Sequence, residues 1–221
     1  MTRMFDTALS DLREMTLRMG GLAEAILAKA VRAVVERRAD LASEVQHDDL
    51  EIDRLDVAID ERVLRALALQ APVADDLRQV IAIKMMTTDI ERVGDIARNI
   101  GKSALRLAER PAVTLPARLG DLADEARHVL KAALDSFADG DTQKARSVLA
   151  ADDQIDEDQD RIVREALEQI ATHPEISSQE IDLILIAKNL ERVGDHATNI
   201  AESVVLATEA LNLKHAEKFR G

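Results

Sequence analysis

The 221-residue chain has no cysteine, tryptophan or tyrosine, and phenylalanine occurs only three times. Without cysteine the chain cannot form a disulfide, a thiolate metal site or a cysteine nucleophile. With so few aromatic side chains it offers no platform on which nucleic acid bases could stack. These absences exclude thiol chemistry and disfavour nucleotide-stacking functions.

Basic residues are scarce relative to acidic ones. Lys and Arg total 29 against 42 Asp and Glu, which gives a formal net charge of −13. Because contacts to phosphates need clustered positive charge, this balance argues against nucleic acid as a partner. A basic protein, a metal cation or an anion bridged by a cation is compatible with the charge.

Long apolar runs are also absent. A membrane-spanning helix needs roughly 20 apolar residues, and the uncharged apolar stretches, such as 183–187, are far shorter. The first six residues lack the apolar core of a signal peptide. We therefore expect a cytoplasmic protein without membrane insertion.

The remaining composition favours long helices, because Ala, Leu, Arg and Glu are abundant and only eight Gly and four Pro interrupt the chain. Breaks are expected at Asp40, which is a plausible helix N-cap, at Pro72, at the 139–141 turn and at Pro174. The 111–116 segment is the clearest linker. Six helices are predicted, over about 6–39, 40–71, 74–109, 117–138, 142–171 and from 178 onward. We expect an all-α fold of two antiparallel three-helix units, 1–110 and 117–214.

One segment occurs twice. Residues 91–100 read ERVGDIARNI and residues 191–200 read ERVGDHATNI, with eight of ten positions identical. The rest of the two halves has diverged, so the repeat indicates an internal duplication of one structural unit.

Carboxylates four residues apart share one face of a helix. Glu91 and Asp95 form such a pair in the third predicted helix, with Asn99 one turn further, and Asp49 and Asp53 form another in the second. The pairs are centred on positions 51 and 93, and their midpoint, position 72, is the proline of the bend. Antiparallel helices would therefore bring both pairs to the same height, roughly 30 Å from that bend at ~1.5 Å per residue.

The second half repeats the arrangement about its own bend at His173 and Pro174. Its pairs are Asp152 with Asp156 and Glu191 with Asp195, and Asn199 takes the place of Asn99. Four oxygen-bearing carboxylates at one level in each half predict a site for a hard cation. The candidates are Fe, Mn, Mg, Ca and Zn, with Asn99 and Asn199 as either extra ligands or hydrogen-bond partners between helices.

Gly94 and Gly194 lie between the two carboxylates of their pairs. A glycine inside a helix costs ~1 kcal/mol relative to alanine, so we expect a neighbouring helix or a metal cluster to approach closely there. Arg92 and Arg192 are interpreted as salt-bridge partners, and His196, which replaces Ile96, as incidental.

Two other interpretations stay open. Carboxylate pairs are common on solvated helix faces, so the bundle could be purely structural without metal. Paired cations could also serve a metal-dependent phosphohydrolase, although no general base, nucleophile or phosphate-binding glycine loop is evident. The residues alone favour no catalytic group.

The duplicated motif resembles that of the PhoU family, as do the segment QAPVADDLR at 70–78 and AKNL at 187–190. The resemblance covers essentially the whole chain. It implies two three-helix bundles related by a pseudo-two-fold axis, often in a homodimer, and a cytoplasmic protein that is not an enzyme. It further implies a negative regulator of the phosphate-starvation response, connecting a phosphate ABC transporter ATPase to a sensor histidine kinase. Some members bind multinuclear metal clusters at positions that match the eight carboxylates named above.

Overall fold

A computed structural model describes residues 4–150, 152–211 and 213, except the side chains of residues 4, 152 and 153. The described residues form helices and no strands. The elements are α1 (Met4–Val35), α2 (Ala39–Gln70), α3 (Asp75–Glu109), α4 (Leu119–Asp139), α5 (Thr142–Leu149), α6 (Asp152–Thr172), the 3-10 helix η1 (Pro174–Ile176) and α7 (Ser177–Glu209). The all-α prediction is confirmed.

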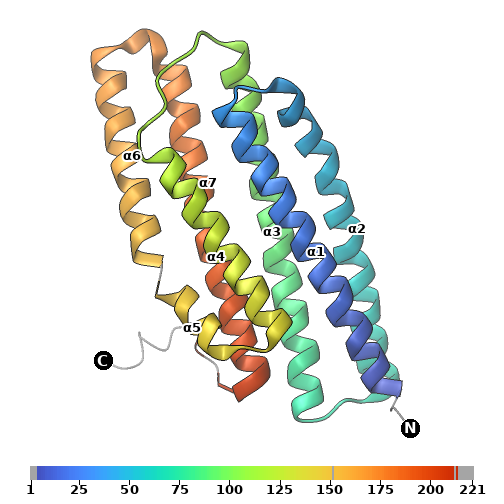
Figure 1. Cartoon of the computed structure of the whole chain (residues 1–221). Coiled ribbons are helices and arrows are strands. Elements are labelled where there is room, and N and C mark those ends of the chain that lie inside the picture. Colours follow the sequence, from blue (N-terminus) through green and yellow to red (C-terminus); the bar gives the residue numbers. More distant parts are fainter. Residues whose placement is uncertain (1–3, 151, 212, 214–221) are drawn as a thin grey trace.

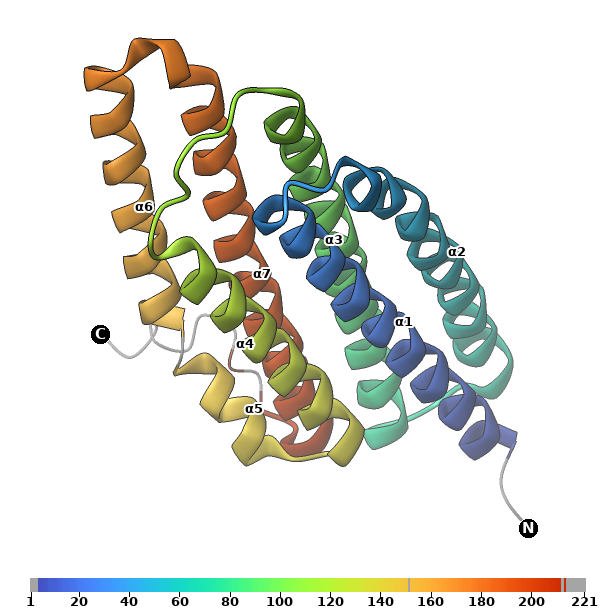
Figure 2. The same ribbon diagram turned by 45° about the horizontal axis from the view of Figure 1, so that its top comes forward.

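Two helical units stand side by side (Figure 1). The first consists of α1, α2 and α3, and the second of α4, α5 with α6, and α7. Helices α3 and α7 pack against each other in the middle, while α2 and α6 lie at opposite outer edges. Helices α1 and α4 cover the central pair (Figure 2). The two copies of the repeated segment therefore lie on the two central helices.

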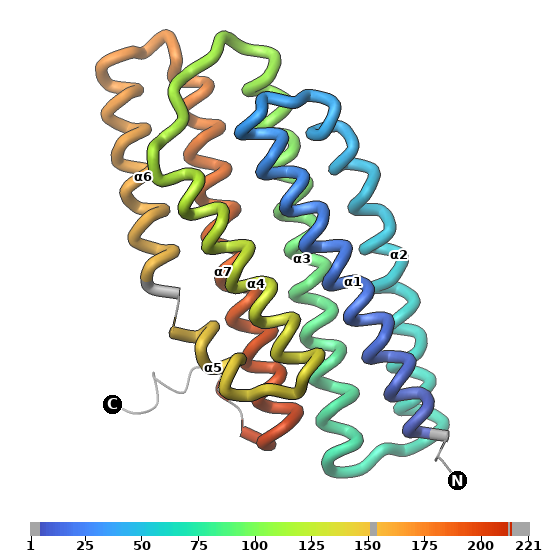
Figure 3. Tube along the Cα trace, viewed as in Figure 1, coloured from blue at the N-terminus to red at the C-terminus, as the bar shows by residue number. Residues whose placement is uncertain are grey.

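Apolar residues at helical spacing build the core. On α2, Ile52, Leu55, Ile59 and Val63 recur every three or four residues and are buried, so one face of the helix is apolar. Facing positions on α1 and α3 are likewise Leu, Ile, Val and Ala. Truncating one of these buried aliphatic side chains to alanine typically costs ~2–5 kcal/mol. The long, nearly parallel axes visible in Figure 3 follow from this continuous stripe.

The bends lie where the prolines predicted them. Helix α2 ends before Ala71, whose backbone is left-handed (φ 43°), and α3 starts only after Pro72 has blocked further helical bonding. Pro174 begins the short 3-10 helix that precedes α7. No helix among the described residues is both long and apolar enough to cross a membrane.

Two boundary predictions were wrong. The helix expected from the 139–141 turn to position 171 is interrupted, since α5 ends at Leu149 and α6 begins at Asp152. Asp40 is not the N-cap of α2, because the helix already starts at Ala39. The Asp40 carboxylate instead accepts a 2.7 Å hydrogen bond from Arg38 Nε.

Candidate functional site

Helix α2 packs against α3. This packing brings the carboxylates of the first half close together, as expected from their equal distances from the bend at Pro72. Burial raises the pKa of Asp49, and the negative charges of Asp53 and Asp95 raise it further. Burial also raises the pKa of Glu91, with Asp95 and Asp53 among the charges that add to it. Asp49 and Glu91 are each influenced by Asp53 and Asp95, and we call these four residues of α2 and α3 the first acidic cluster.

Asp49 is the buried member of this cluster, with only 1% of its surface exposed. Arg98 Nη1 donates a 2.6 Å hydrogen bond to Asp49 Oδ2, and the same guanidinium pairs with Asp95. Asp49 Oδ1 is buried without a hydrogen-bond partner. Because a buried charged oxygen is costly when unpaired, this atom is the strongest candidate for a further cationic ligand.

Gly94 makes room for that carboxylate. A β-carbon at this position would lie 2.6 Å from Asp49 Oδ1 and 3.0 Å from Ile52 Cδ1. Any side chain here would displace Asp49 or separate the helices. The close approach expected from a glycine in mid-helix is confirmed, and what approaches is the carboxylate of α2.

Basic residues partly compensate the first acidic cluster. Arg92 pairs with Asp95 at 3.1 Å and with Glu91 at 3.4 Å, which confirms its predicted role. Arg98 was not identified from the sequence, although it lies one turn beyond Asp95. Its place in the second copy is taken by Thr198, and that departure from the repeat was the available signal.

The acidic stripe continues along α2 toward the bend. Lys84 on α3 approaches Asp56 at 3.5 Å and also pairs with Asp60. Burial raises the pKa of Asp56, whose side chain is only 25% exposed. Lys84 thus limits the first acidic cluster on the side of the bend.

The second acidic cluster has the same framework with different compensation. Burial raises the pKa of Asp195, the nearby charge of Asp156 raises it further, and His196 and Arg192 act in the opposite direction. Asp156 and Asp195 are therefore neighbours across α6 and α7. Glu191 lies one turn before Asp195 on α7, and the side chain of Asp152 lies outside the described part of the structure.

The carboxylates share a level in each half without converging on one point. Among the described residues, no three Asp, Glu or His side chains are grouped closely enough to hold a metal ion. In the first acidic cluster, the Arg98 guanidinium bridges Asp49 and Asp95. The predicted metal ligation remains a prediction.

A further polar contact joins the two halves. His196 Nδ1 lies 2.8 Å from Asp89 Oδ1, and Asn199 Nδ2 donates to the same oxygen at 3.1 Å. The expectation that His196 is incidental was wrong, because it bonds across the α3–α7 interface. Asn199 takes the interhelical hydrogen bond that was one of its two predicted roles.

Comparison with known proteins finds matches over most of the chain. The PhoU domain matches residues 16–104 and again residues 119–204. A phosphate-specific transport system accessory protein PhoU homologue from Caulobacter vibrioides (strain NA1000 / CB15N) is 38% identical over 197 residues, which cover 89% of this chain and 86% of that protein. A PhoU homologue from Pseudomonas putida is 34% identical over 97% of this chain and 84% of its own length. The crystal structure of PhoU from Pseudomonas aeruginosa is similar with a TM-score of 0.91 at 33% identity, covering 94% of this chain and 100% of that one.

Proposed function

The chain belongs to the PhoU family, and from this premise we propose that it is an accessory protein of a phosphate transport system that regulates phosphate homeostasis. In this role it modulates phosphate uptake and represses the phosphate-starvation regulon when phosphate is plentiful. It acts in the cytoplasm, as a homodimer, between the ATPase of a phosphate ABC transporter and a sensor histidine kinase. The relatives are accessory proteins of phosphate-specific transport systems, which supports the transporter part of this proposal.

The observation that carries the proposal is the buried carboxylate of Asp49. Its Oδ1 has no hydrogen-bond partner, while Gly94 leaves it the space of a missing side chain. A helical body can regulate its partners through a group of acidic side chains whose charge changes when a cation binds. The first acidic cluster supplies one, because its carboxylates are partly buried, mutually repulsive and only partly neutralised by arginine.

A hard cation fits the donor chemistry of both acidic clusters. In the first half Asp49, Asp53, Glu91 and Asp95 would hold it, and in the second half Asp152, Asp156, Glu191 and Asp195. All donors are carboxylate oxygens, which Mg²⁺, Mn²⁺, Ca²⁺ and oxidised iron accept. When bound, the cation would offset the repulsion and offer a positive point to phosphate or to an acidic partner.

A gene deletion tests the regulatory role. In phosphate-replete cells, loss of the gene should derepress phosphate-scavenging genes, and the wild-type gene should restore repression. Asp49→Asn should restore it poorly, whereas Glu61→Gln, which removes one charge from an exposed position of the same helix, should restore it fully. Normal repression in the deletion strain would contradict the proposal.

Metal analysis tests the cation separately. Protein purified without chelators should contain Fe, Mn, Mg, Ca or Zn, or should take one up on addition. Asp49→Asn should lower the bound metal and Glu61→Gln should leave it unchanged. If none of the five metals is present and none can be added back, the metal part fails while the regulatory part stands.

A further inference from the structure

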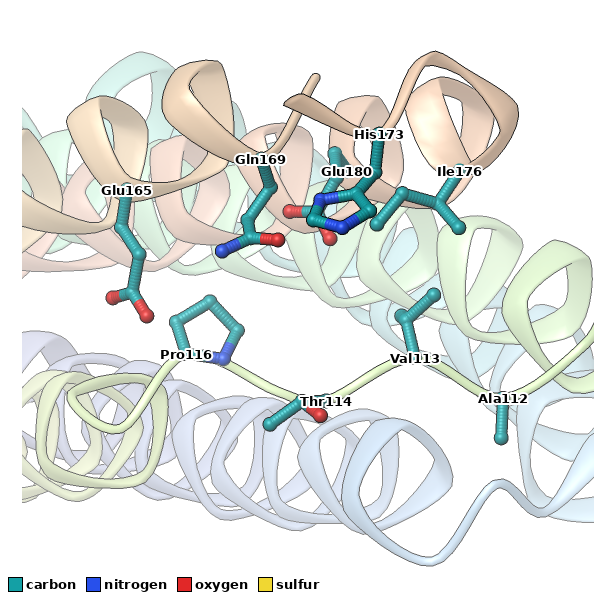
Figure 4. A pocket seen from close by; sticks show the side chains of 9 residues that line it. All are labelled: Ala112, Val113, Thr114, Pro116, Glu165, Gln169, His173, Ile176 and Glu180. Atoms are coloured by element: carbon teal, nitrogen blue, oxygen red, sulfur yellow. The ribbon is translucent and has the colours of Figure 1, made fainter. Parts of the chain in front are cut away.

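The two halves are joined by a linker that covers a pocket of about 450 Å³. The pocket lies between residues 112–116 of the linker, the end of α6 and the start of α7 (Figure 4). Its walls combine two carboxylates, an amide, an imidazole and an apolar side: Glu165, Glu180, Gln169, His173, Val113 and Pro116. We call it the linker pocket. It is separate from both acidic clusters.

Glu180 is the polar centre of the linker pocket. Only 3% of its surface is exposed, yet the side chain lines the pocket and faces the linker, as Figure 4 shows. Within the described residues, no hydrogen bond or ion pair engages this carboxylate. Burial raises its pKa and the negative charge of Glu165 adds to the increase. Glu180 is thus a buried acid on which a second charge of the same sign acts.

Arg110, a basic side chain at the start of the linker, pairs with groups other than Glu180. Arg110 Nη1 donates to Asp182 Oδ2 at 2.8 Å and to the Ser178 carbonyl at 3.0 Å. Gln179 Nε2 reaches the Pro111 carbonyl at 3.5 Å. These bonds tie the start of the linker to α7, so the pocket is built into the fold while its carboxylate is left uncompensated.

The internal duplication shows that the fold does not require this acid. The position equivalent to Glu180 in the first half is Val80, which is fully buried in the apolar core. A valine fills the same place in the helix at no electrostatic cost, whereas the Glu180 carboxylate, which borders the pocket, is partly removed from water without a compensating charge. A ligand of opposite charge would remove that cost.

We propose that the linker pocket binds a small organic cation, with ammonium groups on an aliphatic stem. Glu180 would accept hydrogen bonds from the inner ammonium group and Glu165 from the outer one, while Val113 and Pro116 would contact the methylenes. The volume falls within the ~300–1,000 Å³ typical of small-molecule sites. A bare metal ion suits the pocket less well, since no three ligating side chains among the described residues come together here. This proposal does not depend on the proposed regulatory function.

Calorimetric titration of the full chain with 1,4-diaminobutane tests the site. We expect saturable binding of one molecule per chain. Glu180→Gln keeps the shape and removes the charge, and it should weaken binding about tenfold or more, as expected for loss of a buried charge-assisted hydrogen bond. Glu165→Gln should weaken it less, because that carboxylate is exposed at the rim. The matched control is Glu168→Gln, which removes a charge from an exposed position of the same helix outside the pocket.

Several outcomes would overturn the proposal. Absence of saturable binding to the wild-type protein is one. Equal weakening by Glu180→Gln and Glu168→Gln is another, because it would mean that the diamine only screens the net charge of −13. Equal affinity for n-butylamine would contradict the role of the second carboxylate. Thermal unfolding of Glu180→Gln without ligand separates these results from misfolding, since removal of an unpaired buried charge should leave the fold as stable or more stable.

Discussion

The two copies of the repeated segment differ most informatively at one position. Arg98 of the first copy bridges Asp49 and Asp95, whereas the second copy has Thr198 there. The carboxylate pairs are therefore present in both halves, but the basic residues that offset their negative charge differ. In the first acidic cluster the guanidinium of Arg98 on α3 lies between two carboxylates, whereas in the second cluster Arg192 and His196 act on Asp195.

Other differences point in the same direction. Ile96 and Val80 of the first half are buried and apolar, whereas His196 and Glu180 take their places in the second. His196 then bonds to Asp89 of the first half, and Glu180 faces the linker pocket. In the first half the negative charge of the acidic cluster is thus offset by Arg98. In the second half two polar side chains replace buried apolar ones.

Removing Arg98 should have the largest effect. Arg98→Met keeps the aliphatic bulk but leaves Asp49 buried without a cation, and loss of one member of a buried ion pair costs several kcal/mol. Because the Arg98 side chain is 31% exposed, we expect the low end, about 3 kcal/mol. Urea unfolding at neutral pH measures the change.

The equivalent change in the second half is the control. Thr198→Met should cost far less than Arg98→Met, because Thr198 is half-buried and has no ion pair to lose among the described residues. Asp49→Leu combined with Arg98→Met should recover much of the loss by removing the stranded charge. Mn²⁺ should raise the midpoint of Arg98→Met more than that of the wild type. Equal costs at positions 98 and 198 would refute the contrast between the halves.

Gly94→Ala should come next. Its β-carbon would lie 2.6 Å from Asp49 Oδ1, so we expect a loss of about 1–3 kcal/mol, as for other overpacked sites. Gly21→Ala on α1 has open space around it and should gain about 0.5–1 kcal/mol from the helix preference of alanine. Opposite signs in chemical denaturation are the expected result, and a stabilised Gly94→Ala would show that Asp49 moves aside freely.

A smaller effect concerns pH. The folded-state pKa values of Asp49, Glu91 and Asp195 lie above their ordinary values. In the window between the ordinary and the raised pKa the folded chain holds more protons than the unfolded chain, so this contribution to stability decreases as pH rises. Thermal midpoints should therefore increase as the pH falls from the raised pKa values toward the ordinary carboxyl range.

Variants that replace one of these acids with its neutral amide show which half of the chain causes the pH dependence of the thermal midpoint. Asp49→Asn and Asp195→Asn should each flatten the dependence, and Glu61→Gln should leave it as in the wild type. The increase should end near the ordinary carboxyl range, because interactions such as that of Arg38 with Asp40, which lowers the Asp40 pKa to about 2, are lost at still lower pH. A wild-type midpoint that falls steadily from neutral pH would contradict the assignment.

Much of the fold was predictable because its determinants are local. Proline set the bends at 72 and 174, apolar spacing set the buried faces, and equal distances from a bend placed Asp49 beside Asp95. The break between α5 and α6 was not predictable, since no glycine or proline marks it. Local helix preference alone does not place this break.

The partners of charged groups were harder to predict than their positions. The Arg98 side chain is long enough to pair with several carboxylates. Its pairing with Asp49 depends on which face of α2 packs against α3. The bond from His196 to Asp89 depends on the α3–α7 interface, which joins residues 107 positions apart. A sequence repeat predicts the features that both halves share. It says little about a contact that is formed in only one half or between the halves.

The weakest expected effect is at that single contact. His196→Ile introduces the residue of the first half and removes one hydrogen bond to Asp89, which still accepts from Asn199. The cost should be about 0.5–1.5 kcal/mol. In a double-mutant cycle with Asp89→Asn, the two changes should be non-additive by a similar amount, because each alone removes the same bond. Strict additivity would mean that the bond between His196 and Asp89 adds no stability, and that the α3–α7 interface depends on its apolar packing and on its other polar contacts, such as Arg110 with Asp182.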